Sequence, residues 1–242
     1  MSRAGRIDRA VGVEGPEPEP PTLENGDRLD QPTFHTRYEA MPEDTRAELI
    51  GGIVYLMASP VKRAHGRAHM LTSHWVLSYE DDTPGVEALD NTTNILGPES
   101  EPQPDVCLLI APGHGGQTTE RDGYVVGAPE LVVEVAVSTE SIDLHAKKAD
   151  YEKFGVREYI VVALRQRRVF WFVLQGEQFH ELAPGADGIY RSGCFPGLWL
   201  DPIALLSENK QRLREVLNAG LASTEHTEFV ARLAAFKQEK AP

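Results

Sequence analysis

Residues 129–162, PELVVEVAVSTESIDLHAKKADYEKFGVREYIVV, contain the pattern that decides the fold. LVVEVAV at 131–137 is apolar except for one carboxylate, and such a run is typical of a strand buried on both faces. STES at 138–141 offers N-capping side chains, and Gly155 suits a helix C-terminus, so we expect a helix over residues 141–154. A buried strand followed directly by a helix indicates an α/β fold.

Strand-like runs and turn-rich connections flank this stretch. REYIVVAL and RVFWFVL predict a strand pair split by RQRR at 165–168, a cluster that is either a solvated turn or a DNA-backbone contact. PGHGGQ opens a long loop and lacks the lysine and following helix of a phosphate-binding P-loop. Further strands are expected at VEAL (86–89), NTTNIL (91–96) and PDVCLLI (104–110).

Upstream, TRYEAMPEDTRAELIGGIVYLMASP at 36–60 predicts a short helix and two strands that meet at Gly51-Gly52, with Glu48 on the first strand. Apolar residues at helical spacing predict an amphipathic helix over residues 62–79: Ala64, Ala68, Leu71 and Trp75. Apolar residues after Ala204 predict C-terminal helices that serve packing or association: Leu205, Leu206, Leu213, Val216 and Leu217.

The length of 242 residues suits one domain with tails. Residues 1–30 include GPEPEPPTLENGD and lack hydrophobic periodicity, so we expect a flexible tail there. The folded domain is expected at 31–206 and a helical extension at 207–242. Apolar residues form 41% and charged residues 25% of the chain, which is typical of globular proteins.

Composition also bears on compartment and partners. No run reaches the roughly 18 apolar residues that a membrane helix needs, and MSRAGRIDRAVGVEG lacks a signal-peptide centre, so we expect a cytoplasmic protein without membrane contact. Cys107 and Cys194 lack zinc-site spacing and are expected in the core. The formal charge of −13 argues against tight nonspecific DNA binding, but a metal-dependent nuclease remains compatible because its clustered carboxylates add negative charge.

Two carboxylates stand out on the predicted strands. Glu134 interrupts LVVEVAV, and its buried charge needs a metal, a salt bridge or an exposed edge position to compensate it. Asp105 follows Pro104 at the start of VCLLI, where it is either a turn residue or a side chain projecting from the strand end. Two neighbouring strands can present both carboxylates to one ion.

The predicted helix adds a third element. Asp143, Lys147 and Tyr151 are four residues apart and share one helical face. Asp143 and Lys147 form either an ordinary surface ion pair or part of a site. A neighbouring stripe is expected to pack on the sheet and to leave Lys147 free to lean toward the strand end: Ile142, Ala146 and Ala149.

These residue types suit phosphodiester hydrolysis, which needs metal-bound water and neutralisation of developing negative charge. Asp105 and Glu134 are expected to hold Mg²⁺ or Mn²⁺ through oxygen. Lys147 is expected to orient or deprotonate the attacking water and to stabilise the pentavalent phosphate.

From about residue 36 to 206 the chain resembles the Uma-two family of endonuclease-like proteins, within the PD-(D/E)xK restriction-endonuclease-like superfamily. The matching motifs occur in order: AELIGGIVYLMASP, His65, QPDVCLLI, the stretch quoted first, and FPGLWLDP. The resemblance implies a restriction-endonuclease-like core, in which helices flank a central mixed β-sheet.

The resemblance also implies site residues. The catalytic set is Glu48, Asp105, Glu134 and Lys147, and the metal set is Asp105, Glu134 and Val135. The superfamily pattern places a lysine two residues after the strand acid, where this chain has Ala136. Lys147 is the expected migrated substitute, and Lys148 is its rival.

His65, Ser138 and Tyr151 are expected to bind substrate. For His65 a contact with Glu48 is expected as another site role, and the alternative is a capping or solvated histidine; for Ser138 the alternative is a helix cap. The leading functional hypothesis is an endonuclease that uses Mg²⁺ or Mn²⁺ to cleave DNA. A homodimer is expected for an enzyme that cuts both strands. The alternatives are a noncatalytic interaction or regulatory module with this fold, and a metal-dependent phosphodiesterase acting on RNA or a small phosphoester.

Overall fold

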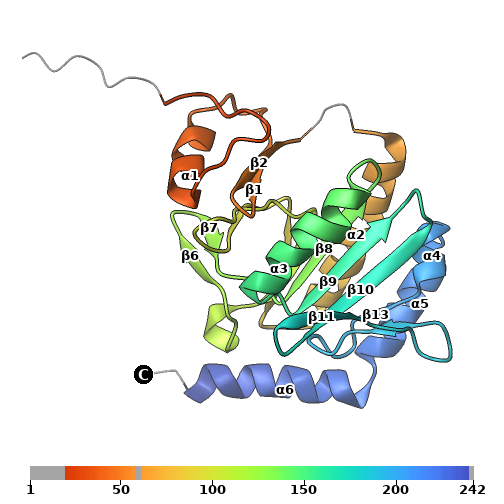
Figure 1. Cartoon of the computed structure of the whole chain (residues 1–242). Helices are drawn as coiled ribbons and strands as arrows, with labels where there is room; N and C mark the ends of the chain where they lie inside the picture. Colours follow the sequence, from red (N-terminus) through yellow and green to blue (C-terminus); the bar gives the residue numbers. More distant parts are fainter. Residues whose placement is uncertain (1–19, 58–60, 240–242) are drawn as a thin grey trace, which may run out of the picture.

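The computed structural model describes residues 20–57 and 61–239. Helices cover both faces of a six-stranded mixed sheet, which confirms the predicted fold class (Figure 1). The strand order is β11-β10-β9-β8-β5-β3, and β8 and β9 are its one parallel pair of neighbours. The strands are β3 (Val86–Asp90), β5 (Val106–Ile110), β8 (Leu131–Ala136), β9 (Glu158–Ala163), β10 (Arg168–Gln175) and β11 (Gln178–Glu181).

Side chains of β8 alternate between two buried faces, as expected for a central strand. Leu131, Val133 and Val135 pack in the same core cluster as α2 (Arg63–Asp81) and the C-terminal helices. Val132 and Ala136 pack on the opposite face, in the cluster that includes Tyr151. Because Glu134 alternates with Val133 and Val135, it belongs to this second face.

The helix predicted over 141–154 is present, but it begins as a π-helix, η2 (Ile142–Lys147), and continues as α3 (Lys148–Phe154). Short π-helical segments are rare and often occur at functional sites. The prediction that the Ile142 stripe packs on the sheet is wrong, because Ala149 is exposed while Asp143 and Lys147 are buried. Burial of this polar face is possible because carboxylates on β1 and β8 pair with Lys147.

A small unit at one end of the sheet contains α1 (Gln31–Glu39), β1 (Ala47–Ile50) and β2 (Ile53–Leu56) (Figure 1). The predicted hairpin is confirmed, with both Gly51 and Gly52 at positive φ. The helix starts at Gln31, earlier than expected. Residues 20–30 are not a flexible tail: Leu23 is buried, and the main chain of residues 26–29 bonds to residues 52–54. Residues 1–19 of the predicted tail lie outside the described residues.

Short strands outside the main sheet were harder to foresee. The run predicted at 91–96 is reduced to β4 (Asn94–Ile95), which joins β6 (Thr119–Arg121) and β7 (Tyr124–Val126) in a three-stranded sheet. A further pair consists of β12 (Tyr190–Arg191) and β13 (Trp199–Leu200). PGHGGQ forms the 3₁₀ turn η1 (Pro112–His114) and the loop after it.

The C-terminal helices are α4 (Pro202–Leu206), α5 (Lys210–Leu221) and α6 (Thr224–Glu239). Apolar residues of all three helices belong to the same core cluster as the sheet: Leu205, Leu213, Leu217, Phe229 and Leu233. These helices therefore pack within the chain, and their buried residues are not available for the predicted homodimer contact. Across the described ranges, no helix combines the length and apolarity needed to span a membrane.

Candidate metal centre

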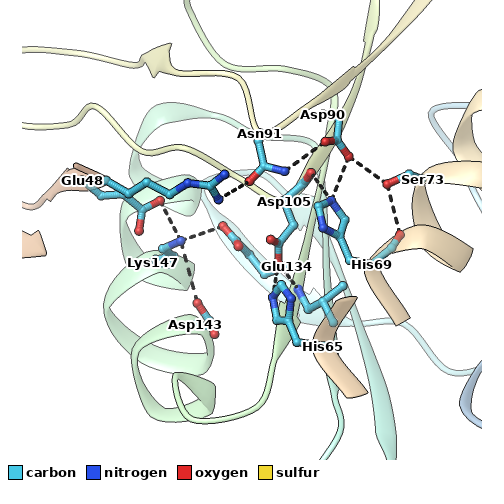
Figure 2. Close-up of polar contacts among 12 residues, drawn as sticks. Glu48, His65, His69, Ser73, Asp90, Asn91, Asp105, Glu134, Asp143 and Lys147 are labelled. Carbon is cyan, nitrogen blue, oxygen red and sulfur yellow. Dashed lines mark hydrogen bonds and ion pairs between the residues drawn. The ribbon is translucent and has the colours of Figure 1, made fainter. Parts of the chain in front are cut away.

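Asp105 and Glu134 come from adjacent antiparallel strands. The register pairs Val106 with Val133, and one further step along both chains brings Asp105 opposite Glu134. Opposed residues in such a pair project from the same face, with Cβ atoms about 4.5–5.5 Å apart. Figure 2 draws the two carboxylates within one polar cluster, and the negative charge of Asp105 contributes to raising the pKa of both Glu134 and Asp143.

The Asp105 carboxylate is fixed at the point where β5 begins. Its Oδ2 accepts a 2.7 Å hydrogen bond from the Val135 main-chain N–H and lies 3.5 Å from His65 Nε2. Burial alone would raise the pKa of Asp105, but the contacts with His65 and Val135 hold it below its ordinary value. Asp105 is therefore ionised at neutral pH, and its side chain is 15% exposed, so it meets solvent.

Val135 can contribute a carbonyl oxygen at the same edge. A strand residue presents its N–H and C=O to the same side, and the N–H of Val135 faces Asp105. Successive residues of a strand present their main-chain groups to opposite sides, and the next residue agrees with this: the Ala136 carbonyl faces β9 and accepts a hydrogen bond from the Leu164 N–H. The Val135 carbonyl and the carboxylates of Asp105 and Glu134 would offer oxygen donors of the kind that Mg²⁺ or Mn²⁺ takes.

Lys147 lies in a cage of carboxylates. Its Nζ is 2.8 Å from Glu48 Oε1, 2.9 Å from Glu134 Oε1 and 3.9 Å from Asp143 Oδ1 (Figure 2). The Lys147 side chain is 3% exposed, and the three acidic side chains are 5% exposed or less. The Tyr151 hydroxyl donates a 2.9 Å bond to the same oxygen of Glu134.

The cage has a surplus of negative charge, since three carboxylates surround one ammonium group and Asp105 is adjacent. Burial and the neighbouring carboxylates raise the pKa of Glu134 well above its ordinary value, against the effect of Lys147. Burial would lower the pKa of Lys147, but Glu134, Glu48 and Asp143 hold it above its ordinary value. Lys147 is therefore a cation that orients and neutralises the carboxylates around it in the metal-free protein, and its predicted action on the attacking water stays a prediction. The surplus charge favours a bound divalent cation.

His65 and His69 come from the N-terminal part of α2 and approach Asp105 from the opposite side. His69 Nε2 lies 2.8 Å from Asp90 Oδ1 and 3.0 Å from the Asp105 main-chain oxygen (Figure 2). The Asp105 hydrogen bond raises the pKa of His65 despite its partial burial. Sequence reasoning missed His69, although HGRAH places two histidines four residues apart on one helical face.

The other predicted residues lie as follows. Lys148 Nζ is 4.8 Å from the centre of the Phe172 ring, so Lys147 and not Lys148 faces Glu134. Tyr151 is 1% exposed and holds Glu134, which differs from the predicted substrate contact. Ser138 is exposed in the loop after β8. The RQRR residues are exposed: residues 165–167 lie in the turn between β9 and β10, and Arg168 begins β10.

Replacing Asp143 with asparagine is expected to stabilise the metal-free protein at pH 8 by about 1–3 kcal/mol. Burial raises the pKa of Asp143 from 3.8 to about 6, so the fold favours its protonated form. That contribution to stability is fully present below pH 3.8 and is lost as the pH rises through about 6. Thermal unfolding followed by circular dichroism should show a gain at pH 8 that disappears near pH 4. Equal gains at both pH values would contradict this account.

A mixed sheet that presents two carboxylates on adjacent strands, with a lysine bonded to one of them, defines the restriction-endonuclease-like class of proteins. The chain belongs to the Uma2 family, described as "Putative restriction endonuclease", whose model matches residues 32–203. The family expected from the sequence motifs is thus confirmed.

A crystal structure of "a putative nuclease belonging to DUF820" from Anabaena variabilis ATCC 29413 is similar in fold, with a TM-score of 0.50. The two chains are 15% identical, and the match covers 75% of this chain and 97% of the other. At this identity the likeness concerns the fold alone. A comparison with curated proteins gave no significant match.

Proposed function

We propose that the chain is a metal-dependent endonuclease that hydrolyses phosphodiester bonds in DNA with Mg²⁺ or Mn²⁺. The observation that carries this proposal is the position of Asp105 opposite Glu134, with the charged Lys147 bonded to Glu134. Membership of the Uma2 family supports a nuclease. The oxygen donor set and the surplus negative charge support a divalent cation.

Asp105, Glu134 and the Val135 carbonyl would hold the ion. When bound, it would supply Lewis acidity toward the phosphate and a water of lowered pKa. Lys147 holds Glu134 and Glu48 in place through bonds of 2.8–2.9 Å, and its charge offsets part of the negative potential that a phosphate would meet. Glu48 is itself held by the Gln103 main-chain N–H.

Substrate would approach from the partly exposed side of Asp105, next to His65, whose predicted contact with substrate stays a prediction. Ser138 remains a predicted substrate contact. The overall charge of −13 requires a local basic surface, and the exposed arginines of the RQRR turn are the candidates for contact with the DNA backbone. Because Arg168 pairs with Glu181, we assign this contact first to Arg165 and Arg167.

Cleavage of supercoiled plasmid tests the proposal. We expect nicked or linear product with Mg²⁺ or Mn²⁺, none in the presence of a chelator, and a loss of rate of at least about 100-fold in Glu134→Gln. Glu87→Gln, an exposed carboxylate on β3, is the matched control and should cleave like the wild type. Cleavage by Glu134→Gln at the wild-type rate would contradict a mechanism in which Glu134 helps to hold the metal. A wild type inactive on DNA but active on RNA or a small phosphoester would redirect the substrate, and one that binds no metal would favour the noncatalytic module.

A further inference from the structure

The two histidines of α2 and Asp105 form a compact group of donors. His65 and His69 are separated by one helical turn, and their ring centroids are 5.8 Å apart. One ligand atom from each histidine and one from Asp105 all lie within 4.8 Å of one another. Figure 2 shows both rings beside Asp105, with His69 on the side of Asp90. The group is therefore built from two elements, α2 and the start of β5.

The two rings are held differently. His65 Nε2 lies 3.5 Å from Asp105 Oδ2, whereas its Nδ1 is buried and has no hydrogen-bond partner within residues 20–57 and 61–239. A buried polar atom without a partner is costly, and a ligand from outside the chain would relieve that cost. His69 is oriented by Asp90, whose Oδ1 also accepts a 2.9 Å bond from Ser73.

The dimensions suit a single ion after a small adjustment. In a tetrahedral site two ligands that are each about 2.1 Å from the metal are about 3.4 Å apart, so a set spread over 4.8 Å closes when each donor atom shifts by about 0.7 Å. The donor types decide the class of ion. Imidazole nitrogen is a better ligand for later first-row transition ions such as cobalt, nickel and zinc than for Mg²⁺, which is held by oxygen ligands and water.

We propose that His65 and His69 supply nitrogen ligands to an ion shared with Asp105, so that this centre prefers first-row transition ions to Mg²⁺. The inference rests on the proposed function in placing an ion at Asp105. Both rings bind as neutral imidazoles, and any extra proton leaves to solvent. If His69 binds through Nε2, the hydrogen that faces Asp90 moves to Nδ1, so the His69 tautomer changes on binding.

The test uses the full chain freed of metal. In calorimetric titrations, Co²⁺ should bind at least about 10-fold more tightly than Mg²⁺, and His65→Ala should weaken Co²⁺ binding by about 10-fold or more. Mg²⁺ binding should change less than Co²⁺ binding in this variant. His69→Ala should act in the same direction. His74→Ala is the matched control, because His74 is exposed on the same helix outside the group and should bind Co²⁺ like the wild type.

A second measurement reads the ligands directly and needs no variant. Pulsed electron paramagnetic resonance of the Mn²⁺-loaded wild type should show ¹⁴N coupling from a directly bound imidazole. Absence of that coupling, or unchanged Co²⁺ affinity in folded His65→Ala and His69→Ala proteins, would overturn the inference. If Mn²⁺ binding is then still lost in Asp105→Asn and plasmid is still cleaved, the proposed function stands with an oxygen-only site. If neither Mn²⁺ nor Mg²⁺ binds, both proposals fall.

Discussion

Replacing Lys147 with methionine is expected to lower the free energy of unfolding by about 3–5 kcal/mol at pH 7 in the absence of metal. Methionine fills a similar volume, so the loss reflects charge and hydrogen bonding more than packing. The substitution leaves Glu48 and Glu134 buried with no cation at 2.8 and 2.9 Å. Urea denaturation of the wild type and the variant measures the difference.

The neighbouring residue provides the control. The Lys148 ammonium group lies over the Phe172 ring. Lys148→Met should therefore lower the free energy of unfolding by at most about 1 kcal/mol. Adding Glu134→Gln to Lys147→Met should recover part of the lost stability, because it removes one of the unpaired charges. A loss below about 1 kcal/mol in Lys147→Met would mean that the carboxylates do not depend on this lysine.

Asp105→Asn is expected to reduce the rate of plasmid cleavage by about 1000-fold or more, equivalent to about 4 kcal/mol of transition-state stabilisation. Asparagine retains an oxygen that can accept the Val135 hydrogen bond, so we expect the free energy of unfolding to change by about 1 kcal/mol or less. The combination of lost activity and retained stability would separate a role in metal binding from a role in folding. Single-turnover cleavage and urea denaturation give the two values.

Asp122→Asn is the matched control for this substitution. Asp122 is exposed in the turn between β6 and β7 and has a positive φ, which asparagine also tolerates. Asp122→Asn should leave both the rate of plasmid cleavage and the free energy of unfolding unchanged. An Asp105→Asn protein that keeps more than about a tenth of the wild-type rate would exclude Asp105 from the metal site.

The four inner strands of the main sheet could be predicted because they are continuous apolar runs that have few alternatives to burial, whereas the edge strand β11 was missed because its sequence, QFHE, is mostly polar. β5, β8 and β9 lie within runs identified from the sequence, and β10 extends one residue beyond its run. β6 and β7 were missed because they are three residues long and exposed or half-buried, so pairing through the main chain leaves little apolar pattern. The predicted tail ended too late because Leu23 is a single buried apolar residue without periodic neighbours.

The carboxylates and the lysine of the candidate site were predictable, whereas His69 and the contacts around the site were not. A carboxylate inside an apolar strand drew attention to Glu134, and helical spacing grouped Asp143, Lys147 and Tyr151. Spacing identifies which residues share a face but cannot tell which face meets the sheet, and a π-helical start changes the rotation of that face. The bond between Glu48 and Lys147 joins residues 99 positions apart, and no local pattern encodes it.

A crystal structure of the protein soaked in Mn²⁺, with an anomalous difference map, tests the central claim most directly. We predict a peak within bonding distance of the Asp105 and Glu134 carboxylates, with Lys147 still bonded to Glu134. A fully occupied Mn²⁺ peak elsewhere, with both carboxylates bound to protein groups alone, would contradict a metal centre at these two strands.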